Sequence, residues 1–182
     1  VGQPDFRTPQ PVVDAAKQAL DDGLHGYTRS QGTEEVCQAV ANYLTKYDLD
    51  VDANDVVVSP GCKQALLYAM MSCLNPGDEV ILFAPAWPSY DGMLKLIGAV
   101  PVHVPVNREN YHPDMDAARA AITSKTKAIV INSPNNPTGA VYLPSEIEEL
   151  TSIAAEHDLW IFDDMIYSDL VYCEHSYVSP AT

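Results

Sequence analysis

The chain has 182 residues, enough for one domain with a hydrophobic core, and its 47% hydrophobic and 19% charged residues are typical of a globular protein. Ten Lys and Arg residues stand against 25 Asp and Glu residues, so the formal net charge is −15. This negative charge repels nucleic acids and anionic membrane surfaces, and it argues against a role in binding either.

The cysteines show no C-x-x-C pair, and the histidines do not fall at spacings typical of zinc ligands. We therefore expect a reduced, metal-free interior and a cytoplasmic location. No apolar run approaches the roughly 18 to 20 residues that span a bilayer. The chain opens on Val1 rather than Met, which indicates the middle of a longer protein.

Apolar residues at helical spacing predict helices over residues 11–20, 36–47 and 65–74. A further helix is expected to open near Ser145, where Ser145 and Glu148 form a capping pattern. Short runs rich in β-branched residues predict five strands, over residues 56–58, 80–83, 100–106, 128–132 and 159–162.

This alternation of strands and helices predicts βαβ units in one domain, with a mainly parallel sheet. The expected fold is α/β, a three-layer α/β/α arrangement. Polar or aromatic clusters follow four of the predicted strands, at residues 59–61, 85–87, 133–139 and 163–164. Because the carboxyl ends of parallel strands share one edge of a sheet, these clusters predict a ligand site at that edge.

The strongest of these signals is the segment 128–139, where a run of β-branched residues breaks into Ser-Pro-Asn-Asn-Pro-Thr-Gly. An isolated cluster of this kind would be only a turn, since Asn, Pro and Gly dominate turns for backbone reasons. Here the cluster follows a buried strand, and two X-Pro bonds lie within four residues. A cis bond at this point would commit the loop to one geometry that aims the Asn136 amide into a cleft.

The strand at 159–162 runs directly into Asp163 and Asp164. A solvated helix cap is one interpretation of these carboxylates. The other is a buried carboxylate, which requires a compensating cation. No Lys or Arg occurs in residues 156–177, so the cation would come from elsewhere in the fold or from a ligand.

Gly61, Cys62 and Lys63 precede the helix at 65–74, and the free N–H groups of a helix N-terminus suit a phosphate. Every helix has such a terminus, and no phosphate-loop motif is present, so this signal is weak alone. Cys62 has no readable His partner, which favours a small buried thiol over a nucleophile. Trp87 lies between prolines in a loop, where it could stack on a planar ring or pack in the core.

Taken in order, these motifs resemble the large domain of the pyridoxal-phosphate-dependent aminotransferases of fold type I, class I/II. The resemblance runs from Gly2-x-Pro4-Asp5-Phe6 to Asp164-x-x-Tyr167. It is closest to the bacterial-type aspartate aminotransferase branch, mainly through residues 133–142. It implies a homodimer that transfers an amino group between an L-amino acid and a 2-oxo acid, with pyridoxal 5′-phosphate as cofactor.

The resemblance also implies a role for each matched residue. Asp164 would pair with the protonated pyridine nitrogen of the cofactor and so supply the missing cation. Asn136 and Tyr167 would bind the phenolic oxygen, and Trp87 would stack on the ring. The cofactor phosphate would bind to Gly61, Cys62 and Lys63, and to Tyr27 of the neighbouring subunit. The substrate would contact Gly2, Trp87 and Asn136. Cys62 and Met165 depart from the residues usual in the family.

In the family, a lysine that forms the internal Schiff base lies beyond the matched region, as do the small domain and two central strands. Residues 1–182 are therefore expected to be a partial large domain without a catalytic residue, poorly stable and inactive alone. Two alternatives share the same cofactor-site residues or fold. They are a pyridoxal-phosphate-dependent carbon–sulfur lyase and a non-enzymatic, aminotransferase-like effector-binding domain.

Overall fold

The computed structural model describes residues 3–182, and Gly2, assigned above to the substrate site, lies outside the described residues. Four strands form the centre of the fold: β1 (Glu79–Ala84), β2 (Val100–Pro105), β3 (Thr126–Asn132) and β4 (Trp160–Asp164). They are accompanied by six α-helices and two short 3-10 helices: α1 (Gln10–Asp21), α2 (Glu34–Leu44), η1 (Thr45–Tyr47), η2 (Ala53–Asp55), α3 (Cys62–Cys73), α4 (Ser89–Leu96), α5 (Met115–Ala121) and α6 (Pro144–Glu156).

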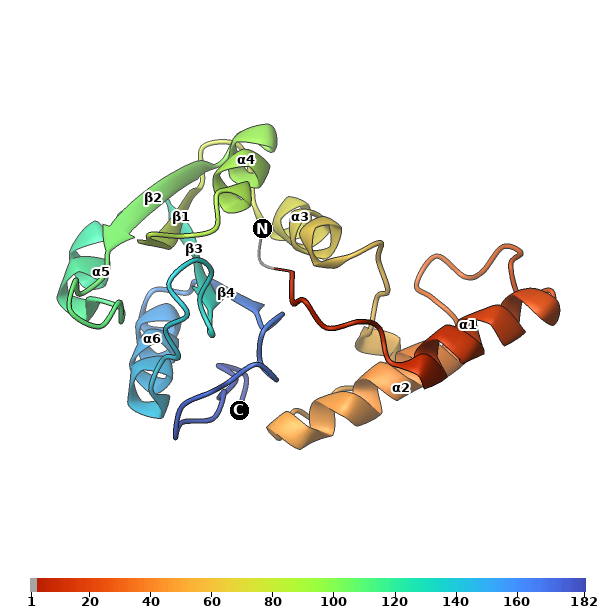
Figure 1. Ribbon diagram of the computed structural model, residues 1–182. Coiled ribbons are helices and arrows are strands. Elements are labelled where there is room, and N and C mark those ends of the chain that lie inside the picture. Colours follow the sequence, from red (N-terminus) through yellow and green to blue (C-terminus); the bar gives the residue numbers. More distant parts are fainter. Residues whose placement is uncertain (1–2) are drawn as a thin grey trace.

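The sheet has the order β2-β1-β3-β4, and every neighbouring pair is parallel. Alternate side chains of the central strands enter two separate cores, because successive residues of a strand point to opposite faces. Val80 and Leu82 pack with residues of α3 and α4, whereas Ile81 and Phe83 pack with residues of α5 and α6. The three-layer α/β/α arrangement is therefore confirmed, and Figure 1 shows the helices on the two faces of the sheet.

The strand expected at residues 56–58 is not formed. A strand needs a neighbour for its backbone groups, and none of the four strands in the described part of the chain lies beside this segment. The Val58 N–H instead donates to the Gln31 carbonyl at 2.8 Å. Val56 packs with Cys37 and Ala41 of α2 in a third, small hydrophobic cluster. Val57 and Val58 are exposed, so hydrophobicity alone predicted neither the pairing nor the burial of this short apolar run.

The capping pattern predicted at Ser145 and Glu148 is also wrong, because the cap lies two residues earlier, at Leu143 and Glu146. The helix α6 begins at Pro144, a residue that fits the first turn because it has no N–H to leave unsatisfied. The Leu143 N–H donates to the carboxylate of Glu146 at 2.7 Å, so Glu146 rather than Glu148 closes the helix terminus. The short helices α4 and α5 were not predicted, since prolines and turn residues flank them.

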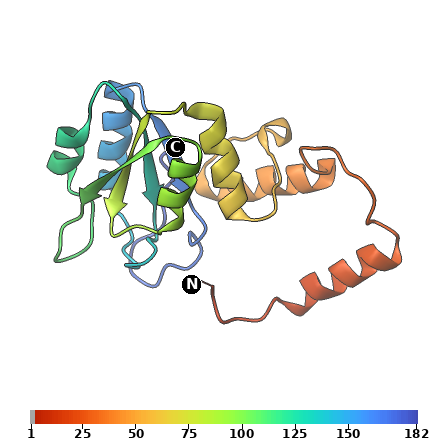
Figure 2. The same ribbon diagram turned by 90° about the horizontal axis from the view of Figure 1, so that it is seen from above.

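The N-terminal segment leaves the body of the molecule as an arm. Figure 2 shows α1 standing away from the sheet, and none of its residues is buried within this chain. Apolar side chains along this segment are exposed, including Val12 and Leu24. The arm returns to the body through Tyr47, whose hydroxyl hydrogen-bonds to Ser168 at 2.7 Å, and through an ion pair of Lys46 with Asp169 at 2.6 Å.

Candidate active site

A cavity of about 300 Å³ lies at the carboxyl ends of the strands, as expected for an open α/β sheet. Its walls come from the N-terminus of α3, from the segment after β1, and from the ends of β3 and β4 with the loops that follow them. The lining residues are Gly61, Cys62, Lys63, Trp87, Tyr90, Asn132, Asn136, Asp164, Ile166 and Tyr167. Seven of the nine residues singled out from the sequence are thus brought together.

Asp164 is the last residue of β4 and is only 4% exposed, so the solvated-cap interpretation fails. The Tyr90 hydroxyl donates to its Oδ2 at 2.6 Å, and the Ile166 N–H donates to its Oδ1 at 3.3 Å. The Cys62 thiol lies 3.5 Å from the same Oδ1. Within residues 3–182, no ion pair joins Asp164 to a basic side chain.

Asn132, at the end of β3, holds the two loops of the site in register. Its side-chain amide donates to the Asp164 carbonyl at 2.8 Å, and its amide oxygen accepts the Asn136 N–H at 2.8 Å. The Asn136 backbone is therefore fixed to the strand that carries Asp164. Asn132 could not be recognised from the sequence as a site residue, because its position indicates only the last residue of an apolar strand.

The loop after β3 is a turn and a part of the site at the same time. The Asn135 side chain accepts from the Thr138 hydroxyl at 2.9 Å, and the Asn135 N–H donates to the Ala140 carbonyl at 2.9 Å. The two X-Pro bonds of this loop, Ser133–Pro134 and Asn136–Pro137, are cis. This closed loop leaves Asn136 at the wall of the cavity.

Helix α3 points its N-terminus at the same cavity. Gly61 caps the helix with φ +89°, a backbone conformation that favours glycine, and Cys62 is the first helical residue. Burial, reinforced by the neighbouring Asp164, raises the pKa of Cys62 to about 12. The thiol is therefore protonated at neutral pH, in agreement with the expectation that it is not a nucleophile.

Trp87 and Tyr90 form one aromatic wall of the cavity. Their rings meet edge to face with centroids 5.3 Å apart, and the Lys63 ammonium lies 5.1 Å from the Trp87 ring centroid. Tyr90 lies three residues after Trp87, but the sequence did not indicate it as a site residue because helix α4 was not predicted.

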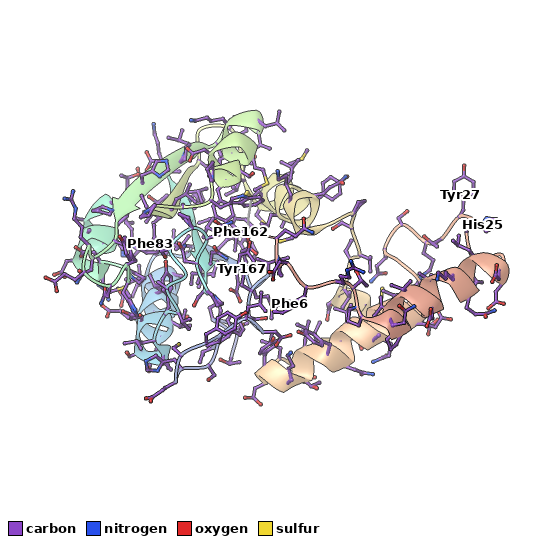
Figure 3. All side chains as sticks on the ribbon, viewed as in Figure 1. Phe6, His25, Tyr27, Phe83, Phe162 and Tyr167 are labelled. Carbon is purple, nitrogen blue, oxygen red and sulfur yellow. The ribbon has the colours of Figure 1, made fainter. Side chains whose placement is uncertain are left out.

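Tyr27 is not brought to this cavity. It is fully exposed at the far end of the arm, well away from Tyr167, as Figure 3 shows. A contact with the cavity of the same chain is therefore absent. The position agrees with the expectation that Tyr27 acts on a neighbouring subunit, which stays a prediction.

Asp163 and Asp164 are adjacent but point to opposite faces of the sheet, as successive strand residues do. Asp163 accepts hydrogen bonds at Oδ2 from the hydroxyls of Tyr177 and, at 3.4 Å, Ser179. Its Oδ1 is buried and has no partner among residues 3–182. Burial is the main cause that raises the pKa of Asp163 to about 6, and the nearby Asp164 adds to it.

The chemistry of the cavity fits an anionic aromatic cofactor with a protonated ring nitrogen. A buried carboxylate with no cation among residues 3–182, a helix N-terminus and an aromatic wall lie around one space. Within residues 3–182, no group of three or more His, Cys, Asp or Glu side chains is arranged to hold a metal ion. The same residues contain no helix with the length and hydrophobicity to cross a bilayer.

Fold and cavity together define an α/β protein with a polar and aromatic cavity at the carboxyl ends of its parallel strands. A family model described as "Aminotransferase class I and II" matches residues 1–181, so the chain belongs to this family. Membership implies dependence on pyridoxal 5′-phosphate.

Individual relatives agree with this assignment. A probable aspartate/prephenate aminotransferase of Thermus aquaticus is 43% identical over all of this chain and 48% of the relative. An aspartate aminotransferase of Sulfolobus acidocaldarius is 40% identical over 94% of this chain and 44% of its own length. The chain thus spans about half the length of these curated relatives.

Solved structures of the family superpose closely. The aspartate aminotransferase from Thermus thermophilus with maleate matches 99% of this chain and 47% of that chain, with a TM-score of 0.95 and 42% identity. An aromatic aminotransferase from Pyrococcus horikoshii matches 100% of this chain and 49% of that chain, with a TM-score of 0.96 and 37% identity.

Proposed function

We propose that the full-length protein is a pyridoxal-phosphate-dependent aminotransferase that moves an amino group between an L-amino acid and a 2-oxo acid. The observation that carries the proposal is Asp164, a buried carboxylate that faces a cavity and has no cation within the described chain. A cofactor with a protonated ring nitrogen supplies that cation. When bound, pyridoxal 5′-phosphate withdraws electrons from the α-carbon of the substrate.

The residues of this chain would bind and orient the cofactor. Asp164 keeps the ring nitrogen protonated, and Asn136 and Tyr167 hydrogen-bond the phenolic oxygen. Trp87 covers one face of the ring and also excludes water from it. The N–H groups at the start of α3, from Gly61 to Lys63, hold the phosphate, supported by the helix dipole.

Residues 1–182 would then be a part of the large, cofactor-binding domain. The lysine that moves the proton, and the small domain, would belong to the rest of the full-length protein. The exposed apolar arm supports a homodimer, because burying Val12 and Leu24 against a second subunit removes apolar area from water. In that dimer Tyr27 would reach the phosphate bound by the partner, and Gly2 would lie beside the substrate carboxylate.

An assay of the full-length protein with aspartate and 2-oxoglutarate tests the proposed reaction directly. The names of the aspartate and aspartate/prephenate aminotransferase relatives support this choice of substrates. We expect amino transfer to 2-oxoglutarate and no ammonia release from a cystathionine-type substrate. Product from the second substrate alone would establish the lyase alternative. Cofactor binding without turnover of either would favour an effector-binding domain.

The 182-residue polypeptide itself is expected to show no transamination above background. Its described part contains residues that orient a cofactor, whereas the proton-transferring lysine is proposed to lie outside it. The measurement compares this polypeptide with the full-length protein at equal concentration and saturating cofactor. Turnover by the shorter polypeptide would mean that one of its own residues performs the proton transfer.

A further inference from the structure

The Asp164 carboxylate already has three hydrogen-bond donors before any cofactor binds. The Tyr90 hydroxyl donates to Oδ2 at 2.6 Å, and Tyr90 is only 1% exposed. The Ile166 N–H at 3.3 Å and the Cys62 thiol at 3.5 Å both contact Oδ1. An O–H to carboxylate bond of this length is among the stronger protein hydrogen bonds.

The arrangement limits what else this carboxylate can accept. An ionised carboxylate has about four lone-pair positions, two on each oxygen. Two donors occupy Oδ1 and one occupies Oδ2, so a single position is left, on Oδ2. Asp164 lines the cavity, and that position is available to a ligand there.

We propose that Tyr90, with Cys62 as a weaker second donor, is a positioning residue that fixes the Asp164 carboxylate so that Oδ2 alone receives the protonated ring nitrogen. This inference rests on the proposed function. The Tyr90 hydroxyl acts through Asp164.

The surroundings of Tyr90 fit this role. Burial, followed by the neighbouring Asp164, raises the pKa of the Tyr90 hydroxyl far above its ordinary value, so that the hydroxyl stays a donor. The Tyr90 N–H also bonds to the Trp87 carbonyl at 3.1 Å. One turn of chain therefore sets both the aromatic wall and the carboxylate. A fixed carboxylate loses no rotational freedom when the cofactor binds, which increases affinity.

The test measures binding of pyridoxamine 5′-phosphate to the cofactor-free, full-length protein by titration calorimetry, because this probe forms no covalent bond with lysine. Tyr90→Phe is expected to raise its dissociation constant about tenfold, the weight of one hydrogen bond to a charged group. For an analogue with CH in place of the ring nitrogen, the same substitution should change affinity less than about twofold. The control is Tyr111→Phe, a second loss of a tyrosine hydroxyl at an exposed loop position.

A double-mutant cycle with Asp164→Asn separates this inference from the proposed function. If Asp164→Asn leaves pyridoxamine phosphate affinity unchanged, the proposed role of Asp164 itself fails. If Asp164→Asn weakens binding but Tyr90→Phe does not, or if Tyr90→Phe weakens both ligands equally, the positioning role is overturned. The inference predicts that Tyr90→Phe adds less than about twofold in the Asp164→Asn background, because the two residues act as one unit.

A second pair of variants applies if Tyr90→Phe does not fold. Cys62→Ala removes the weaker donor, and Cys62→Ser keeps a donor at the same position. We expect Cys62→Ala to weaken pyridoxamine phosphate binding about threefold, as for a weak hydrogen bond, and Cys62→Ser to bind within about twofold of the unchanged protein. Equal affinities of the two variants for both ligands would contradict a role for the thiol as a donor.

Discussion

Replacement of Asp164 by Ala in the full-length protein is expected to lower turnover about a thousandfold, the scale of losing one electrostatic group at a reacting centre. Asp164 is the buried carboxylate of the cavity, and without it nothing in residues 3–182 keeps a bound ring nitrogen protonated. An unprotonated ring withdraws electrons from the α-carbon less strongly, so the barrier to proton removal rises. Steady-state transamination at saturating cofactor measures the effect.

The matched control is Asp116→Ala, which removes an exposed carboxylate from the first turn of α5. It should change turnover less than about twofold, since exposed charges far from a site contribute little. Retained cofactor, shown by its absorbance, separates loss of chemistry from loss of binding. Near-normal turnover of Asp164→Ala with cofactor bound would remove Asp164 from the mechanism.

The second large effect is expected at the neighbouring carboxyl, where Asp163→Asn should stabilise the protein at pH 8 but not near pH 4. Burial raises the folded-state pKa of Asp163 from 3.8 to about 6. Between these two values the folded state holds a proton that the unfolded chain has lost, so the free energy of unfolding falls as pH rises through this window. The whole loss, about 3 kcal/mol, is present above pH 6.

A neutral amide avoids the cost of an ionised carboxylate whose buried Oδ1 has no donor in residues 3–182. We expect a gain of about 2 kcal/mol at pH 8, seen as a higher thermal midpoint of the full-length protein. Asp116→Asn, at an exposed position, should show no such pH-dependent difference. Destabilisation by Asp163→Asn at every pH would indicate that a donor from the rest of the protein binds this carboxylate.

Much of the central fold could be predicted from the sequence because its strands bury both faces. Residues 80–83 and 128–131 are unbroken apolar runs, and β1 and β3 are buried as such runs require. The segment 56–58 shows the same hydrophobicity and is no strand: Val56 packs on α2, while Val57 and Val58 are exposed. Whether a short apolar run forms a buried strand therefore depends on which segments become its neighbours in the fold.

The candidate site could be predicted where its residues follow strands directly. Asn136 and Asp164 come just after apolar runs, and both lie at the cavity. Tyr90 and Asn132 could not be found in this way, because each is identified only by a partner distant in sequence. Tyr90 reaches Asp164 across 74 positions, and Asn132 reaches it across 32.

The sequence by itself determined the alternation of strands and helices, the loop residues at the strand ends and the resemblance to one family, since these depend on local spacing. Only the tertiary structure decided that Asp164 is buried while Asp163 faces the opposite layer. It also decided that Tyr90 and Cys62 contact Asp164. The physical reason is that burial and hydrogen bonding depend on which elements meet across the sheet. The spacing of residues along one segment does not determine those contacts.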